Sequence, residues 1–182
     1  METFSAAVKM LSVHVVLVNA AEQDREIHPI DVKNAYLQSL LKETIYMRLL
    51  QGVLKPGQEG KVCHLLKDLY KLKQARHGWY QKLTKVLVGK LGFKRSALNH
   101  SVFYRCHDEE HTVVAVATND MALMSKWAVD IVKLKSEIRQ HWEITDGGEM
   151  HCYLGFKIKQ DRAAQTISIN QHAYIEALLE KF

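Results

Sequence analysis

Apolar residues along the chain recur at two spacings, and each spacing predicts a type of element. Over residues 4–22 they recur every three or four positions behind a candidate N-cap, Ser5, which predicts an amphipathic helix. The β-branched run over residues 13–18 would also suit a strand. Strands are further expected over residues 25–32, 43–49 and 61–65, with a glycine-containing loop over residues 51–60.

The second half of the chain predicts an alternation of helices and strands. A helical stripe runs from Leu69 to Leu87, so a helix is expected over residues 67–90 with Gly92 after its end. The other expected elements are strands over 101–106, 112–117 and 121–124, a tight turn at Asn119-Asp120, a helix over 127–142, a strand pair over 153–159 and 166–170, and a final helix over 171–182. The predicted core includes Val15, Ile30, Leu69, Val116, Ile131 and Leu154.

Composition places the chain among ordinary globular proteins. Its 182 residues are 47% hydrophobic and 25% charged, without a linker or a repeat, which predicts one domain over residues 1–182. No apolar run approaches the roughly 18 residues of a membrane span, so no membrane partner is expected. Three widely spaced cysteines favour reduced thiols and an intracellular location, in the cytoplasm or the nucleus.

Positive charge is concentrated in one basic helical segment, residues 61–95. This segment holds eight lysines and two arginines against one acid, Asp68, whereas the whole chain has a net charge of only +5. Such a segment predicts either a phosphate-binding face or a solvated helix. The interleaved Tyr70, Trp79 and Tyr80 would stack on nucleic-acid bases in the first case and fill the core in the second.

Two acidic positions stand out against their apolar surroundings. Asp31 lies on or just past the strand expected over residues 25–32, and a buried carboxylate without a partner is costly. It is therefore either a metal ligand or the N-cap of a helix that begins near Lys33. Asp120 is expected at the tip of a strand-turn-strand unit.

The order of these motifs resembles the palm domain of copia-type retrotransposon reverse transcriptases, over nearly the whole chain. The resemblance implies an α+β fold, with a polymerase palm-like antiparallel sheet packed on helices and partial fingers. The motifs that carry it are Glu26-Ile27-His28, Asp31-Val32-Lys33, Glu43-Thr44-Ile45-Tyr46-Met47, Leu69-Tyr70-Lys71-Leu72-Lys73-Gln74-Ala75, Trp79-Tyr80, Leu91-Gly92-Phe93, Asn119-Asp120, Tyr153-Leu154-Gly155-Phe156 and Tyr174-Ile175.

The resemblance also implies roles for particular residues. Asp31, with the backbone carbonyl of Val32, and Asp120 are expected to hold Mg²⁺ or Mn²⁺ for nucleotide transfer to an RNA or DNA template-primer. Tyr36 is expected to exclude a ribonucleotide 2′-hydroxyl. Nucleotide contacts are further expected at Lys73 and Gln74, and nucleic-acid contacts at Lys71, Arg76, Lys82, Lys85, Leu154 and Gly155.

The chain departs from the family at the expected catalytic centre. The family has Tyr-Val-Asp-Asp where this chain has Ala117-Thr118-Asn119-Asp120, so the neutral amide of Asn119 replaces a metal-binding carboxylate. Lys71 stands where the family has glycine, and Arg76 where it commonly has proline. The resemblance starts late in the family domain, without the upstream basic strand.

These departures predict a truncated, catalytically inactive reverse transcriptase. The alternative is a remnant of a transposon polyprotein that binds nucleic acid or another protein without enzymatic activity. Its protein partner would be a second copy of this chain or the polymerase of an intact element.

Overall fold

The computed structural model describes residues 9–49, 52, 57–58, 60–107 and 110–181. The described residues divide into two compact units, one within residues 34–83 and the other within residues 9–33 and 84–181. Among the described strands, the two units share no sheet, and the single domain expected over residues 1–182 stays a prediction.

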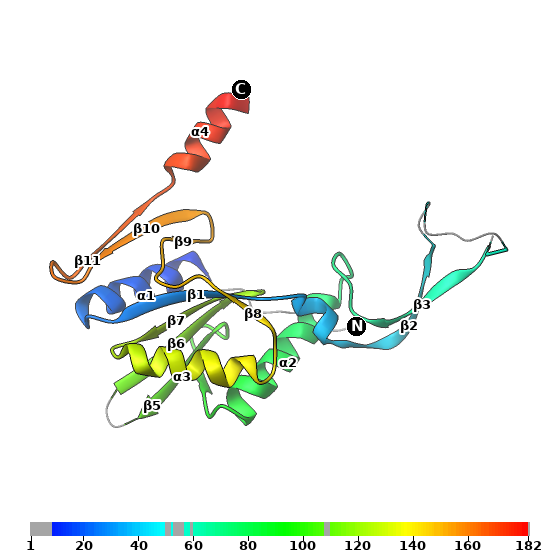
Figure 1. The fold of residues 1–182 in the computed structure, drawn as a ribbon, viewed down its shortest axis with the longest axis horizontal. Coiled ribbons are helices and arrows are strands. Elements are labelled where there is room, and N and C mark those ends of the chain that lie inside the picture. Colours follow the sequence, from blue (N-terminus) through cyan, green and yellow to red (C-terminus); the bar gives the residue numbers. More distant parts are fainter. Residues whose placement is uncertain (1–8, 50–51, 53–56, 59, 108–109, 182) are drawn as a thin grey trace. The chain divides into compact units, whose positions relative to one another are not determined.

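The larger unit is built on an antiparallel sheet whose described strands have the order β4-β5-β6-β7-β1-β8. Figure 1 shows β5, β6, β7 and β1 side by side. Their bounds are β1 Glu26–Val32, β4 Lys94–Arg95, β5 Val102–His107, β6 Glu110–Ala117, β7 Asp120–Ser125 and β8 Ile144–Asp146. The expected strand over 25–32 and the expected hairpin are thereby confirmed, and Asp120 is the first residue of β7 instead of the tip of the turn.

Helices cover this sheet, and β7 is buried along residues 121–125. Helix α1 (Met10–Glu22) packs Val13, Leu17 and Ala20 against Ile27 of β1 and Met124 of β7. Helix α3 (Ala128–Arg139) contacts β7 and buries its own apolar stripe, which consists of Ile131, Leu134 and Ile138. The mixed helices and antiparallel strands confirm the α+β class.

A second sheet of the larger unit has the order β11-β10-β9, followed by a helix. Its described elements are β9 Cys152–Tyr153, β10 Phe156–Asp161, β11 Thr166–Asn170 and α4 His172–Lys181. Ile158 of β10 joins the core cluster beneath α1, so this sheet shares the core of the larger unit. The final helix expected over 171–182 is confirmed for residues 172–181.

The smaller unit contains an antiparallel hairpin and the first part of a helix. The 3-10 helix η1 (Ala35–Gln38) leads into β2 (Leu40–Arg48), which pairs with β3 (Val62–Lys67). Helix α2 (Ala75–Gly89) begins in this unit and ends in the larger one. It starts eight residues later than expected because Lys71 has a φ of +76°, which interrupts the helical pattern.

Two of the predicted core residues are wrong, and the helix α1 shows why. Val15, which was expected in the buried stripe of this helix, is 60% exposed, whereas Val13 and Leu17 are buried. Residues 10–18 are apolar on most of their circumference, so spacing alone does not determine which side faces the sheet. Leu154 is 37% exposed in a turn, while Ile30, Val116 and Ile131 are buried as predicted and Leu69 is half-buried.

Candidate functional site

The register of the central strands places two carboxylates opposite each other. Asp31 on β1 pairs with Asp120 on β7 and, on its other side, with Thr145 on β8. Ile30 and Val32 are buried, and alternation along a strand directs Asp31 to the opposite face. Because Asp31 lies within β1, its alternative interpretation as a helix N-cap is wrong.

Asn119 is held against Asp31 by its side chain and against Val32 by its backbone. The turn between β6 and β7 places Thr118 at φ +64°, a left-handed conformation that few residues other than glycine adopt. From this turn the amide Nδ2 of Asn119 donates a hydrogen bond to Oδ1 of Asp31. The carbonyl oxygen of Asn119 accepts a hydrogen bond of 3.0 Å from the backbone N–H of Val32.

The two carboxylates influence each other electrostatically. Burial, and then the charge of Asp31, raise the pKa of Asp120 above its ordinary value. Burial, and then Asp120, also raise the pKa of Tyr153, whose hydroxyl donates a hydrogen bond of 3.2 Å to the Ala115 carbonyl. Tyr153 was missed as a neighbour of Asp120, because nothing in the spacing of the two residues indicates that they meet.

The donor set at this site fits a pair of divalent cations poorly. Among the described residues, no three His, Cys, Asp or Glu side chains converge on one point. Hard cations need several oxygen ligands, and two of them about 4 Å apart need more than two carboxylates. The side chain of Asn119 presents its NH₂ group to Asp31, so it occupies the carboxylate with a hydrogen-bond donor.

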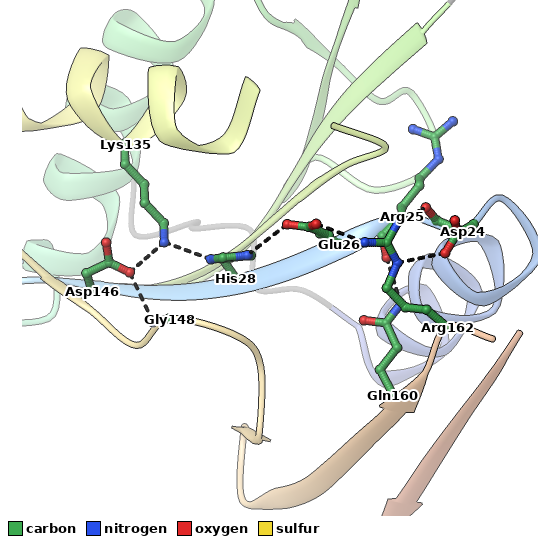
Figure 2. Close-up of polar contacts among 9 residues, drawn as sticks. All are labelled: Asp24, Arg25, Glu26, His28, Lys135, Asp146, Gly148, Gln160 and Arg162. Atoms are coloured by element: carbon green, nitrogen blue, oxygen red, sulfur yellow. Dashed lines mark hydrogen bonds and ion pairs between the residues drawn. The ribbon is translucent and has the colours of Figure 1, made fainter. Parts of the chain in front are cut away.

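A polar network fixes β1, the strand that carries Asp31, to α3 and β8 (Figure 2). Nζ of the buried Lys135 lies 2.8 Å from Nδ1 of His28 and 2.5 Å from Oδ1 of Asp146. An ammonium group is only a donor, so Nδ1 of His28 accepts, and Nε2 carries the proton directed at Glu26, 3.3 Å away. Arg139 adds a second contact of 3.0 Å to Asp146.

The same network continues toward β10 at the other end of β1. Arg162 lies 2.7 Å from Asp24 and 2.8 Å from Glu26, and Gln160 donates a hydrogen bond of 2.7 Å to the Arg25 carbonyl (Figure 2). Burial alone would raise the pKa of Asp146, but hydrogen bonds from Lys135, Gly148 and Arg139 lower it overall. Charged side chains therefore contact β1 at Glu26 and at His28.

The expected nucleotide-binding residues lie in the smaller unit. Tyr36 in η1 makes an edge-to-face contact with Tyr70, with ring centroids 4.6 Å apart. Lys73 is exposed, and Gln74 is half-buried with its Nε2 lacking a hydrogen-bond partner. Their roles in binding nucleotide stay predictions, because they belong to a different unit from Asp31, Asn119 and Asp120.

The basic residues of the expected nucleic-acid face are all exposed, but one of them is already hydrogen-bonded within the protein. Lys71, Arg76 and Lys85 are exposed. Lys82 is also exposed, but its Nζ donates a hydrogen bond to the Gln38 carbonyl. Burial, and then the nearby Lys67, lower the pKa of Lys82.

Both residues between β9 and β10 have left-handed backbone conformations. The φ angles are +52° at Leu154 and +80° at Gly155, and Phe156 pairs with Tyr153 across the turn. Two such residues form the tight hairpin turn that twisted strands favour. Glycine adopts this conformation without strain, whereas Leu154 does so at an energetic cost.

An α+β domain with paired carboxylates on neighbouring antiparallel strands is the class of structure that these observations define. The family described as "Reverse transcriptase (RNA-dependent DNA polymerase)" matches residues 1–182. This chain belongs to that reverse transcriptase family, and it is a domain of the copia type.

Three relatives illustrate the relationship. The chain is 34% identical to the Retrovirus-related Pol polyprotein from transposon TNT 1-94 of Nicotiana tabacum, over 100% of this chain and 14% of the relative. It is 30% identical to the Retrovirus-related Pol polyprotein from transposon RE1 of Arabidopsis thaliana, over 99% of this chain and 12% of that relative. It is 27% identical to the putative transposon Ty5-1 protein of Saccharomyces cerevisiae, over 71% of this chain and 42% of that relative. The chain thus spans about one-seventh or less of the two plant polyproteins.

Members of this family normally use divalent metal ions and bind a nucleic-acid template.

No solved structure matches this chain significantly. Within the described residues, no helix is long and apolar enough to cross a membrane.

Proposed function

We propose that this chain is a reverse-transcriptase domain that does not catalyse nucleotide transfer. The observation that carries the proposal is the hydrogen bond from the Asn119 amide to Oδ1 of Asp31. It satisfies the carboxylate within the protein, so Asp31 needs no cation to be stable. Asp31 and Asp120, with the Val32 carbonyl, are the remaining candidates to hold Mg²⁺ or Mn²⁺.

The chemistry of the reaction supports inactivity. Nucleotide transfer needs two metal ions, one to activate the primer hydroxyl and one to stabilise the leaving pyrophosphate. Replacing a carboxylate by an amide removes a full negative charge next to those ions. Loss of an outer-sphere partner already costs about 10–100-fold in metal affinity or activity, so loss of a direct ligand should cost at least as much.

Primer extension on an RNA template, with Mg²⁺ or Mn²⁺, tests this proposal. The parent chain, Asn119→Asp and Asp31→Ala would be compared. We expect no extension by the parent or by Asp31→Ala, and we expect Asn119→Asp to bind Mg²⁺ more tightly than the parent by isothermal titration calorimetry. Extension by the parent that is lost in Asp31→Ala would refute the proposal.

We further propose that the basic segment 61–95 binds the backbone of a template-primer. Lys71, Arg76 and Lys85 are exposed, which supports contact with phosphates. Three such contacts with a single strand predict that the logarithm of the binding constant falls against the logarithm of salt with a slope of about −2. Substitution of Arg76 or Lys85 by Gln should flatten that slope, and Lys133→Gln on the exposed face of α3 is the matched control.

The location and self-association of the chain also remain proposals. All three cysteines carry free thiols, which supports the expected location in the cytoplasm or nucleus. Helix α4 exposes Tyr174, Ile175 and Leu179, each more than half accessible, which supports self-association. Sedimentation of the parent and of Leu179→Glu would test it, and a monomeric parent would contradict it.

A further inference from the structure

Helix α4 has an apolar face that the described part of the chain leaves largely exposed. Every residue of α4 whose side chain the structure describes is exposed. Its four large apolar side chains are spaced so that they share one face of the helix, and they are Tyr174, Ile175, Leu178 and Leu179. A helix of ten residues is marginal by itself in water, so α4 needs a surface to pack on.

A groove of matching character lies on the larger unit, between helix α1 and strand β11. Its volume is about 810 Å³. The lining residues come from the two elements and the residue before β11, and they are His14, Leu17, Val18, Ala21, Glu22, Gln165, Thr166, Ile167 and Ile169. Glu22 is the only Asp, Glu, Lys or Arg among these lining residues, so the groove has no positive charge to attract a nucleic acid.

The outer side of α1, next to this groove, is apolar as well. Leu11, Val15 and Val18 follow one another at spacings of four and three residues, and each is more than half exposed. Val18 also lines the groove, so the two surfaces are continuous. These three residues and Ile169 of β11 form what we call the α1–β11 face. An exposed apolar surface of this extent is typical of a protein–protein interaction site.

The apolar face of α4 and the α1–β11 face together have the size that a stable dimer requires. Their eight side chains each expose on the order of 100 Å², or roughly 800 Å² in one copy of the chain. If each copy placed its α4 on the α1–β11 face of the other, roughly 1,600 Å² would be removed from water. Specific, stable protein interfaces bury about 1,200–2,000 Å² in total.

We propose that this chain forms a symmetric dimer in which α4 of each copy packs into the groove between α1 and β11 of the other copy. The inference rests on the proposed self-association and adds the surface that receives α4. A second copy fits as the occupant because it supplies an apolar helix and an apolar groove at once. A twofold axis then forms both contacts in one event and covers the exposed apolar surface of both copies.

Charged substitutions in the two faces test the inference by sedimentation of the full chain. Leu179→Glu changes the helix and Val18→Lys changes the groove, and both residues are exposed, so the variants should keep the circular dichroism of the parent. A charge that is buried without a partner should weaken one contact about tenfold, and the dimer has two such contacts, so its dissociation constant should rise about a hundredfold. Leu98→Glu and Val132→Lys place the same charges at exposed apolar residues outside both faces and should leave the dimer unchanged.

Mixing the two variants tests which surfaces meet. In a mixed dimer of Leu179→Glu with Val18→Lys, one contact is that of the parent, and the other brings the two introduced charges of opposite sign together. We therefore expect the equimolar mixture to associate about tenfold more tightly than either variant alone. An absence of any gain on mixing would overturn the inference.

Failure of the inference and failure of the proposed self-association give different results. If Leu179→Glu dissociates while Val18→Lys associates like the parent, α4 mediates self-association without entering the groove, and only the inference is wrong. If both variants associate like the parent, another surface joins the copies, and the inference is again wrong. A parent that is monomeric at every concentration tested refutes both proposals, including the case in which α4 packs on the groove of its own chain.

Discussion

Restoring the acid at position 119 should destabilise the protein when no divalent metal is present. Asn119→Asp removes the N–H donor that Asp31 accepts and places a third carboxylate beside Asp31 and Asp120. A hydrogen bond to a charged group is worth about 1.5–3 kcal/mol. Like charges near a protein surface add up to about 4 kcal/mol of repulsion at 4 Å, before screening.

Solvent and proton uptake reduce this repulsion, because the three side chains are only partly buried. We therefore expect the free energy of unfolding to fall by about 2–3 kcal/mol at mildly alkaline pH. For a chain of this size the melting temperature should fall by about 4–12 °C. The loss should shrink as the pH falls, since protonation removes the added charge.

Thermal unfolding in EDTA and in Mg²⁺ would measure the effect. Asn119→Ala is the matched control, because it removes the hydrogen bond without adding a charge. Its loss should not depend on Mg²⁺, whereas Mg²⁺ should recover part of the stability of Asn119→Asp. An Asn119→Asp variant that melts at or above the parent in EDTA would refute the reasoning.

Three further predictions concern the backbone, packing and titration. Lys71→Gly should raise the free energy of unfolding, measured by urea unfolding, by about 1 kcal/mol, because Lys71 has a φ of +76°. Lys73 lies outside the left-handed region, so the control Lys73→Gly should not raise it. Gly78→Ala should lower the melting temperature, because its Cβ would meet the Asp68 carboxyl, while Gly89→Ala, with no atom within 4 Å of an added Cβ, should not. Because the pKa of Asp120 is raised, its contribution to the free energy of unfolding should increase as the pH falls from neutral toward about 4. Asp120→Asn should flatten this part of the curve of stability against pH. An unchanged curve would contradict the raised pKa of Asp120.

The position of Lys71 shows how a departure in sequence becomes a physical cost. The sequence already showed Lys71 where the family has glycine. The structure adds a left-handed backbone conformation at the same residue. The helix therefore begins at Ala75 instead of residue 67, although the apolar spacing continues through residues 69 and 72.

Spacing alone predicted most elements, because local periodicity follows from backbone geometry. The pairing of Asp31 with Asp120 was implied by the family resemblance and is shown by the strand register. The strands around Asp31 and Asp120, the helix α3 and the final helix all follow from spacing. It could not determine which side of α1 packs on the sheet. That choice depends on what the rest of the chain offers as a partner, and it buries Val13 instead of Val15.

The sequence by itself determined the family, the α+β class and the loss of an acid at Asn119. Only the tertiary structure decided what that loss does. It pairs β1 with β7, so that the Asn119 amide reaches Asp31, 88 residues away in the sequence. It also buries Asp68 against Gly78, which no periodicity indicates. Local patterns arise from neighbouring residues, whereas hydrogen bonds and buried charges depend on residues that only the fold brings together.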